Sequence, residues 1–200
     1  MQTHILKHSV YLKSGYSIVG PLEGKGPLKD YFDYIIKDDT MKEKTFEKSE
    51  RKLLQHIILG AIDKAGLSVR DIDLFIGGDL LNQIVSSSFT ARELELPFVG
   101  LYSACATMTE SLAIASLFIE LGIAKYIVAG TCTHFSSAER QYRFPLELGN
   151  QRPPTAQWTI TGGGASIITN EKSKIKIYAV TFGKVIDFGI TDVNLSLIHI

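Results

Sequence analysis

The longest helical pattern in the sequence lies in residues 45–65. Thr45 is a candidate N-cap before it, and Gly66 can end the helix. Apolar residues recur between them at the spacing of three and four that places side chains on one helix face, namely Leu54, Ile57, Ile58, Ala61, Ile62 and Ala65. The pattern predicts an amphipathic surface helix here. A second helix is predicted over residues 83–93.

Short apolar runs alternate with these helices along the chain. They predict strands at residues 15–20, 74–77, 126–130, 165–169 and 174–185. Strands and helices that alternate at this density indicate an α/β fold, with a largely parallel sheet covered on both faces. Residues 1–13 are polar and weakly patterned, so we expect a loose arm there.

Residues 99–116 predict a strand, a sharp turn and a buried helix, with Cys105 at the turn. The helix over residues 106–121 carries only two charges, Glu110 and Glu120, which is typical of a helix inside a domain. Unpaired N–H groups and the positive end of the helix dipole favour a thiolate at such a position. Cys105 is therefore a candidate nucleophile or ligand contact. The alternative is a packed cysteine that behaves as a small apolar side chain.

A second cysteine and a histidine follow the predicted strand at residues 126–130. Cys132 and His134 lie just beyond its end, where α/β folds place ligand sites. We expect Cys105, Cys132 and His134 to share one cleft. A packed cysteine and a hydrogen-bonded structural histidine would give the same sequence pattern.

Composition excludes several classes of protein. A chain of 200 residues with 45% hydrophobic residues can build a sizeable core. Its 21 basic and 21 acidic residues cancel, so no overall field attracts nucleic acid or an acidic lipid surface. Two cysteines predict neither a disulfide framework nor a metal site, and we expect no cofactor. Charges and a glycine interrupt the apolar residues 111–129, so we expect no transmembrane segment.

Two further stretches carry candidate features. Residues 162–164 are three glycines between strand-like runs, and they open no helix, so crowding of the backbone explains them better than a phosphate-binding loop. Residues 134–158 predict a long loop rich in arginine, proline and aromatic residues. Such a loop is typical either of a functional site or of a contact with a second subunit.

Several motifs together resemble the stage V sporulation protein AD family, part of the thiolase-like superfamily that includes the beta-ketoacyl carrier-protein synthases. The most specific are Gly-Asp-Leu-Leu-Asn-Gln at residues 78–83 and Pro-Pro-Thr-Ala-Gln-Trp at residues 153–158. Others are Ala-Cys-Ala-Thr at 104–107, Gly-Thr-Cys-Thr-His at 130–134 and Glu-Arg-Gln-Tyr-Arg-Phe-Pro at 139–145. The resemblance implies a thiolase-like layered α/β fold, of which residues 1–194 form the first half and the start of the second. Residues 195–200 look foreign to the family, and we expect an anomalous tail there.

The resemblance also implies a function and a set of partners. It implies a non-enzymatic sporulation protein that binds dipicolinic acid, a pyridine dicarboxylic acid, for uptake into the developing spore. It further implies a homodimer when full length, held on the spore inner membrane by membrane proteins of the same transport assembly, with no nucleic acid partner. A rigid aromatic dianion needs N–H donors and a cation. The candidate ligand-binding residues are Cys105, Ala106, His134, Arg140, Arg143 and Asn82.

Two other functions use the same residues differently. A thiolase-type or ketoacyl-synthase-type acyltransferase would use Cys105 as its nucleophile. The superfamily's remaining catalytic residues come from the second half of the fold, so the resemblance favours binding over catalysis. The third alternative is a dimerising scaffold with an empty cleft.

Overall fold

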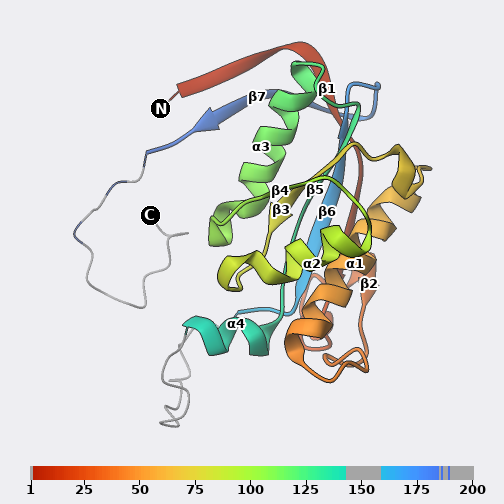
Figure 1. Ribbon diagram of the computed structural model, residues 1–200, viewed down its shortest axis with the longest axis vertical. Helices are drawn as coiled ribbons and strands as arrows, with labels where there is room; N and C mark the ends of the chain where they lie inside the picture. Colours follow the sequence, from red (N-terminus) through yellow and green to blue (C-terminus); the bar gives the residue numbers. More distant parts are fainter. Residues whose placement is uncertain (1, 143–158, 185, 187–188, 190–200) are drawn as a thin grey trace.

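The computed structural model describes residues 2–142, 159–184, 186 and 189, which form a seven-stranded sheet flanked by helices (Figure 1). The strand order is β2-β1-β6-β5-β3-β4, and β7 pairs with the outer part of β1. The strands are β1 (Gln2–Val19), β2 (Tyr34–Ile35), β3 (Leu74–Gly78), β4 (Phe98–Gly100), β5 (Tyr126–Thr133), β6 (Gly162–Thr169) and β7 (Ile175–Phe182). The predicted α/β fold class is confirmed.

The sheet is mixed rather than largely parallel, which corrects the sequence prediction. Strands β4, β3 and β5 are parallel, with Phe75 opposite both Phe98 and Val128. Strand β6 runs antiparallel to both β5 and β1, and β7 runs antiparallel to β1. Buried strands of either direction give the same short apolar run, so the pattern could not distinguish them.

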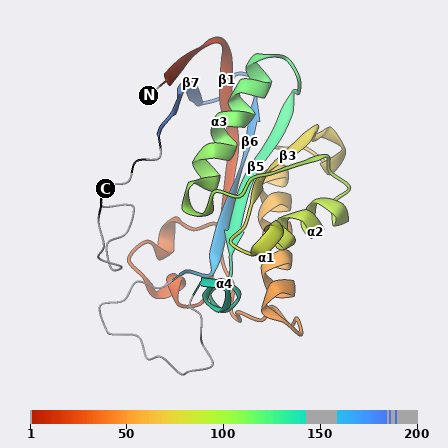
Figure 2. The same ribbon diagram turned by 60° about the vertical axis from the view of Figure 1, so that its left-hand side comes forward.

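Four α-helices accompany the sheet in the described residues, α1 (Phe46–Lys64), α2 (Val85–Glu93), α3 (Thr107–Glu120) and α4 (Phe135–Tyr142). Figure 2 shows α3 on one side of the sheet and α1 and α2 on the other. Strand β5 alternates accordingly, because Val128 packs in the cluster under α1 whereas Ala129 packs in the cluster under α3. This period of two gives the molecule two separate cores.

Helix α1 follows the sequence prediction closely. The Thr45 hydroxyl accepts a hydrogen bond from the Lys48 N–H at 3.3 Å, which is an N-cap. Gly66 follows the helix with φ +71°, a left-handed conformation that glycine adopts without strain. The buried face of the helix carries Leu53, Leu54, Ile57, Ile58, Ala61 and Ile62.

Residues 1–13 were expected to be a loose arm, and this was wrong for all the described residues among them. Strand β1 begins at Gln2, and its outer part pairs with β7 from Gln2 opposite Phe182 to Leu12 opposite Ile175. Most side chains of this part are exposed, so no apolar alternation marks it as a strand. Backbone pairing with a strand far along the chain determines its structure.

The predicted loop at residues 134–158 and the apolar residues 111–129 differ in how well they match the structure. Helix α4 occupies Phe135–Tyr142, where a loop was predicted, while residues 143–158 of that predicted loop lie outside the described residues. The apolar stretch at residues 111–129 divides into the end of α3 and the start of β5. Within the described part of the chain, no helix combines the length and the apolar character that crossing a membrane requires.

Candidate functional site

The parallel strands β3, β4 and β5 end at one edge of the sheet, and three of the predicted site residues follow them. Asn82 comes after β3, Cys105 after β4 and His134 after β5. Ligand sites of α/β sheets form at the carboxyl ends of such strands. The fold therefore places the three residues at the same edge, although their side chains lie in different surroundings.

Cys105 lies in the turn between β4 and α3 and is exposed. The turn is held by the Ala106 N–H, which donates to Ser103 O at 2.9 Å, and by the Ser103 N–H, which donates to Thr107 Oγ1 at 3.3 Å. Ala104 has φ +45°, which is unusual for a residue with a side chain. The predicted sharp turn is confirmed. No side chain caps the N-terminus of α3, which leaves the Cys105 thiol at an uncapped helix start.

Two glycines allow the turns at this edge to approach each other. A Cβ on Gly78 would lie 2.0 Å from the Leu101 carbonyl oxygen, and one on Gly100 would lie 2.2 Å from Ile84 Cδ1. The contact at Gly78 is with backbone and permits only glycine, whereas the flexible end of Ile84 could move away from a side chain at position 100. The segment that carries Asn82 and the segment that leads to Cys105 are therefore packed against each other.

Asn82 is exposed, and a buried carboxylate holds its turn in place. Asp79 Oδ1 accepts a hydrogen bond from the Leu81 N–H at 2.9 Å, and Oδ2 accepts from the N–H and the hydroxyl of Ser87, both at 2.7 Å. Burial raises the pKa of Asp79, and the hydrogen bonds from Ser87 oppose that rise. Asp79 thus positions the turn and does not face solvent.

His134 is buried, with 1% of its surface exposed. Its Nε2–H donates to the Asp39 carbonyl oxygen at 2.9 Å, its Nδ1 accepts from the Ser136 N–H at 3.1 Å, and its ring stacks on Phe46 at 5.0 Å. Both ring nitrogens therefore have partners, and the proton lies on Nε2. A contact between His134 and a ligand would break one of these bonds, and it stays a prediction.

Cys132 does not join Cys105 in a cleft, so that part of the sequence prediction was wrong. Its side chain packs in the core under α1, whereas Cys105 precedes α3 on the opposite face of the sheet. Cys132 Sγ lies 3.8 Å from the Glu50 carbonyl oxygen and 3.9 Å from Glu50 Oε1. Burial and the nearby Glu50 carboxyl raise the pKa of the Cys132 thiol.

Glu50 is the polar residue that the sequence analysis missed. It is fully buried on α1, and its Oε2 accepts a hydrogen bond from the Ser137 hydroxyl on α4. Burial raises the pKa of Glu50 to about 8, a rise that the Ser137 bond opposes and the nearby Asp79 increases. The signal was available in the sequence, because Glu50 lies three and four residues before Leu53 and Leu54, on the same apolar face.

The two arginines proposed as ligand cations are placed differently. Arg140 lies on α4, about half exposed, and forms an ion pair with Glu47 at the start of α1. A contact with a ligand at Cys105 would require Arg140 to leave this partner. Arg143 lies outside the described residues.

Crowding explains two of the three glycines at residues 162–164, and Gly164 has room for a side chain. A Cβ on Gly163 would lie 2.4 Å from the Thr131 carbonyl oxygen, and one on Gly162 would lie 2.9 Å from the Ile18 carbonyl oxygen. These glycines belong to β6, between β1 and β5, and form no phosphate loop. Among the residues that the structure describes, no group of three or more His, Cys, Asp or Glu side chains is arranged to hold a metal ion.

Comparisons with known proteins agree with the fold. A family model described as Stage V sporulation protein AD matches residues 1–196. A Stage V sporulation protein AD from Bacillus subtilis (strain 168) is 41% identical over 191 residues, which are 96% of this chain and 56% of that protein. The chain thus spans little more than half of the length of this curated relative.

Solved structures of thiolase-like enzymes share the architecture at low sequence identity. An OleA variant from Xanthomonas campestris matches with a TM-score of 0.58 and 14% identity, over 83% of this chain and 57% of that one. The priming beta-ketosynthase of a polyketide biosynthetic pathway matches with a TM-score of 0.53 and 15% identity, over 83% of this chain and 51% of that one. At such identities the likeness establishes the thiolase-like fold and no activity.

Proposed function

The chain belongs to the stage V sporulation protein AD family, and from this membership we propose that it binds dipicolinic acid during uptake of that compound into the developing spore. The ligand lies at the Cys105 turn, where α3 begins. This role is non-enzymatic: the Cys105 thiol contacts the ligand and forms no covalent bond with it.

The uncapped N-terminus of α3 is the observation that carries the proposal. The first N–H groups of a helix are donors without partners inside the helix, and the helix dipole favours an anion beside them. Cys105 is exposed there, and α3 has no side-chain cap. The Ala106 and Thr107 N–H groups already donate to Ser103 O and Ala104 O, so a carboxylate of a rigid aromatic diacid meets the other donors of the first turn. The exposed Asn82, whose turn packs against the segment leading to Cys105, adds an amide group at the same edge.

The same exposed thiol at a helix start favours one alternative, an acyltransferase with Cys105 as nucleophile. Such an enzyme needs a base to take the thiol proton and N–H donors for the oxyanion. The structure gives His134 partners at both ring nitrogens, so that residue is not free to act as this base. We therefore favour binding over acyl transfer.

The further partners follow from family membership. We propose that the protein acts as a homodimer and associates with membrane proteins of the dipicolinate transport assembly on the spore inner membrane. Co-purification of the full-length protein with such membrane proteins from sporulating cells tests this, and a protein recovered alone under mild detergent would oppose it.

Calorimetry with dipicolinate tests the binding function directly. Dipicolinate should release or absorb heat on titration into the full-length protein and raise its melting temperature, because a ligand of the native state stabilises it. Cys105→Trp should abolish the signal by filling the space at the turn, whereas Cys105→Ser should keep it. No heat and no shift at millimolar dipicolinate would remove the proposal. An acyl adduct on Cys105 after incubation with acyl-CoA, detected by mass spectrometry, would support the acyltransferase instead.

A further inference from the structure

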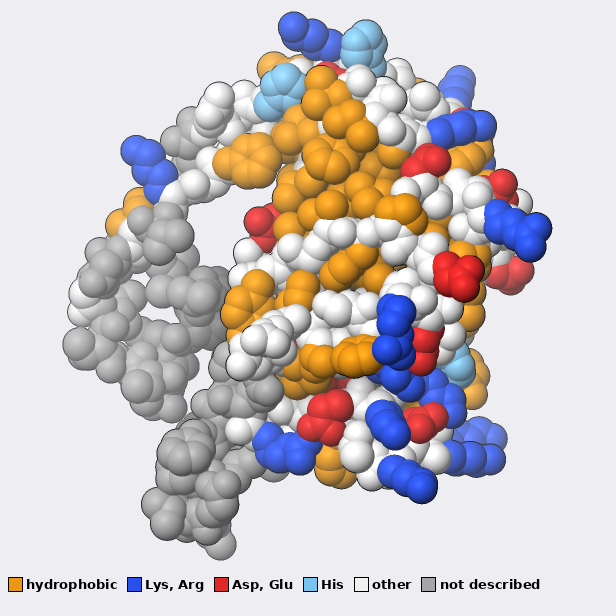
Figure 3. All heavy atoms as spheres, in the orientation of Figure 1, with side chains coloured by type: hydrophobic (Ala, Val, Ile, Leu, Met, Phe, Trp, Pro, Cys, Tyr) orange, Lys and Arg blue, Asp and Glu red, His pale blue; other side chains and the backbone are white. Residues whose placement is uncertain are grey.

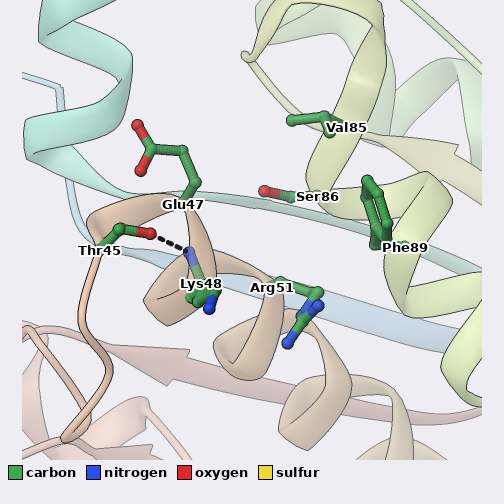
Figure 4. Close-up of a pocket in the computed structure, with 7 residues that line it drawn as sticks. All are labelled: Thr45, Glu47, Lys48, Arg51, Val85, Ser86 and Phe89. Atoms are coloured by element: carbon green, nitrogen blue, oxygen red, sulfur yellow. Dashed lines mark hydrogen bonds between the residues drawn. The ribbon is translucent and has the colours of Figure 1, made fainter.

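A cavity of about 300 Å³ lies between the first turns of α1 and the start of α2. Figure 4 shows its walls: Lys48 and Arg51 extend from α1, while Val85, Ser86 and Phe89 come from α2. It lies on the α1 and α2 side of the sheet, whereas Cys105 precedes α3 on the other side. The cavity is therefore separate from the site proposed for dipicolinate.

Positive charge collects around this cavity. Lys48 and Arg92 have no ion-pair partner among the described residues, and Arg51 shares its charge with Glu93 at 3.3 Å. The Arg92 guanidinium lies 4.5 Å from the centre of the Phe89 ring. Figure 3 shows Lys and Arg side chains over α1 and α2, with Asp and Glu side chains among them. These cations favour a ligand that carries one negatively charged group.

Ser86 gives an independent indication of a ligand. The residue is 2% exposed, and its Oγ forms no hydrogen bond of normal geometry among the described atoms. Figure 4 shows this hydroxyl directed into the space between the two helices. Its polar neighbour is the Glu50 carboxyl, whose pKa it lowers through a weak hydrogen bond. A buried hydroxyl without a well-formed hydrogen bond is costly, so a bound group that supplies a good acceptor is favoured.

Apolar groups line the rest of the space. The Phe89 ring and the Val85 methyl groups offer a flat, apolar wall opposite the cations. Glu47 also lines the cavity and forms an ion pair with Arg140. A second carboxylate on the ligand would meet this like charge, which disfavours a diacid.

We propose that this cavity binds a small aromatic monocarboxylate. Its ring packs on Phe89 and Val85, and its carboxylate accepts hydrogen bonds from Ser86 and lies beside Lys48 and Arg51. The preference for one carboxylate separates this site from the dipicolinate site at Cys105.

Benzoate is the probe for this site, and benzyl alcohol is its neutral counterpart. In the full-length protein, benzoate should shift the backbone amide resonances of Ser86 and Phe89, and benzyl alcohol should do so at least about tenfold more weakly because it lacks the charge. Ser86→Ala should weaken benzoate binding about tenfold, and Lys48→Gln should weaken it severalfold and reduce its salt dependence. Lys52→Gln is the matched control, since Lys52 lies on the same helix and contacts Glu43 outside the cavity.

Several outcomes would overturn the proposal. They are unchanged Ser86 and Phe89 resonances at millimolar benzoate, equal binding of benzyl alcohol, and equal loss of affinity in the Lys52 control. Circular dichroism of each variant shows whether it is folded. Loss of benzoate binding in Cys105→Trp would place the ligand at the other face of the sheet and oppose this site. Dipicolinate binding is measured in a separate titration. The absence of dipicolinate binding at Cys105 and the absence of benzoate binding at this cavity can therefore be distinguished.

Discussion

The Sγ atom of Cys132 lies 3.9 Å from Oε1 of Glu50, in the interior between β5 and α1. Ser137 donates to the other carboxyl oxygen of Glu50, so the acid joins a helix, a strand and the start of α4. An ionised carboxylate in these surroundings is costly, which is why burial raises the pKa of Glu50 to about 8. The fold therefore contains an acid that keeps its proton at neutral pH.

We expect the free energy of unfolding to fall as the pH rises from about 5 to about 8. In the unfolded chain, Glu50 loses its proton near its ordinary pKa of 4.5, but in the folded protein it keeps the proton until about pH 8. The folded state thus binds more protons in this window, and stability decreases with pH by roughly 4 kcal/mol. Urea unfolding followed by circular dichroism across this range measures the slope.

Glu50→Gln removes this titration and provides the comparison. The variant should match the parent at pH 5 within about 1 kcal/mol and exceed its stability at pH 8. A smaller slope should remain, because burial also raises the pKa of Asp79. Glu43→Gln is the control, because the hydrogen bond from Lys52 lowers the pKa of that partly exposed carboxyl, which therefore titrates below the window. If the free energy of unfolding fell with pH equally steeply in the parent and in Glu50→Gln, the pH dependence would not come from Glu50.

The two cysteines should differ strongly in reactivity. Cys105 is exposed, whereas Cys132 is 5% exposed and burial raises the pKa of its thiol. Iodoacetamide should alkylate Cys105 at least about tenfold faster in the native protein, because thiolate fraction and access set the rate. Peptide mapping by mass spectrometry measures both rates. In urea the two rates should converge, and equal rates in the native state would show that Cys132 is accessible.

Two neighbouring glycines of β6 should tolerate alanine very differently. A Cβ on Gly163 would lie 2.4 Å from the Thr131 carbonyl oxygen, whereas the nearest atom to one on Gly164 is Tyr16 O at 3.6 Å. Gly163→Ala should lower the free energy of unfolding by about 2 to 4 kcal/mol, since backbone must move. Gly164→Ala should change it by less than about 1 kcal/mol. Urea unfolding of both variants decides this, and similar losses would mean that crowding is not the cause.

Local chemistry explains which elements the sequence predicted well. Helix α1 has a capping threonine, a continuous apolar face and a terminating glycine, and all three lie within the segment itself. The turn at Cys105 was predictable for the same reason, because a strand, a turn and a helix follow one another directly. Such features depend on neighbours in the sequence, so the sequence alone identifies them.

The missed features depend on residues that are distant in the sequence. The outer part of β1 is a strand because β7 pairs with it, and the direction of β6 depends on β1 and β5. The positions of Cys132 and His134 depend on Glu50 and Asp39, which come from segments about 80 and 95 residues earlier. The predicted cleft failed for Cys132 because adjacent sequence does not decide which face of a sheet a side chain occupies.

The apolar surface over α3 leads to the last prediction. Leu121 and Ile123, just after the end of α3, are 71% and 61% exposed, and Leu112 and Phe118 on α3 are only partly buried. Figure 3 shows a hydrophobic surface across this region. The family resemblance implies that a second half of the fold covers it.

A protein that consists of residues 1–200 alone should therefore self-associate at micromolar concentration, because exposed apolar patches of this kind drive association. Sedimentation measures this directly. Leu121→Lys should shift the population toward monomer, while Leu22→Lys, at a position 69% exposed on the loop after β1, should not. A monomer that unfolds in one cooperative transition without either substitution would show that the α3 face needs no cover.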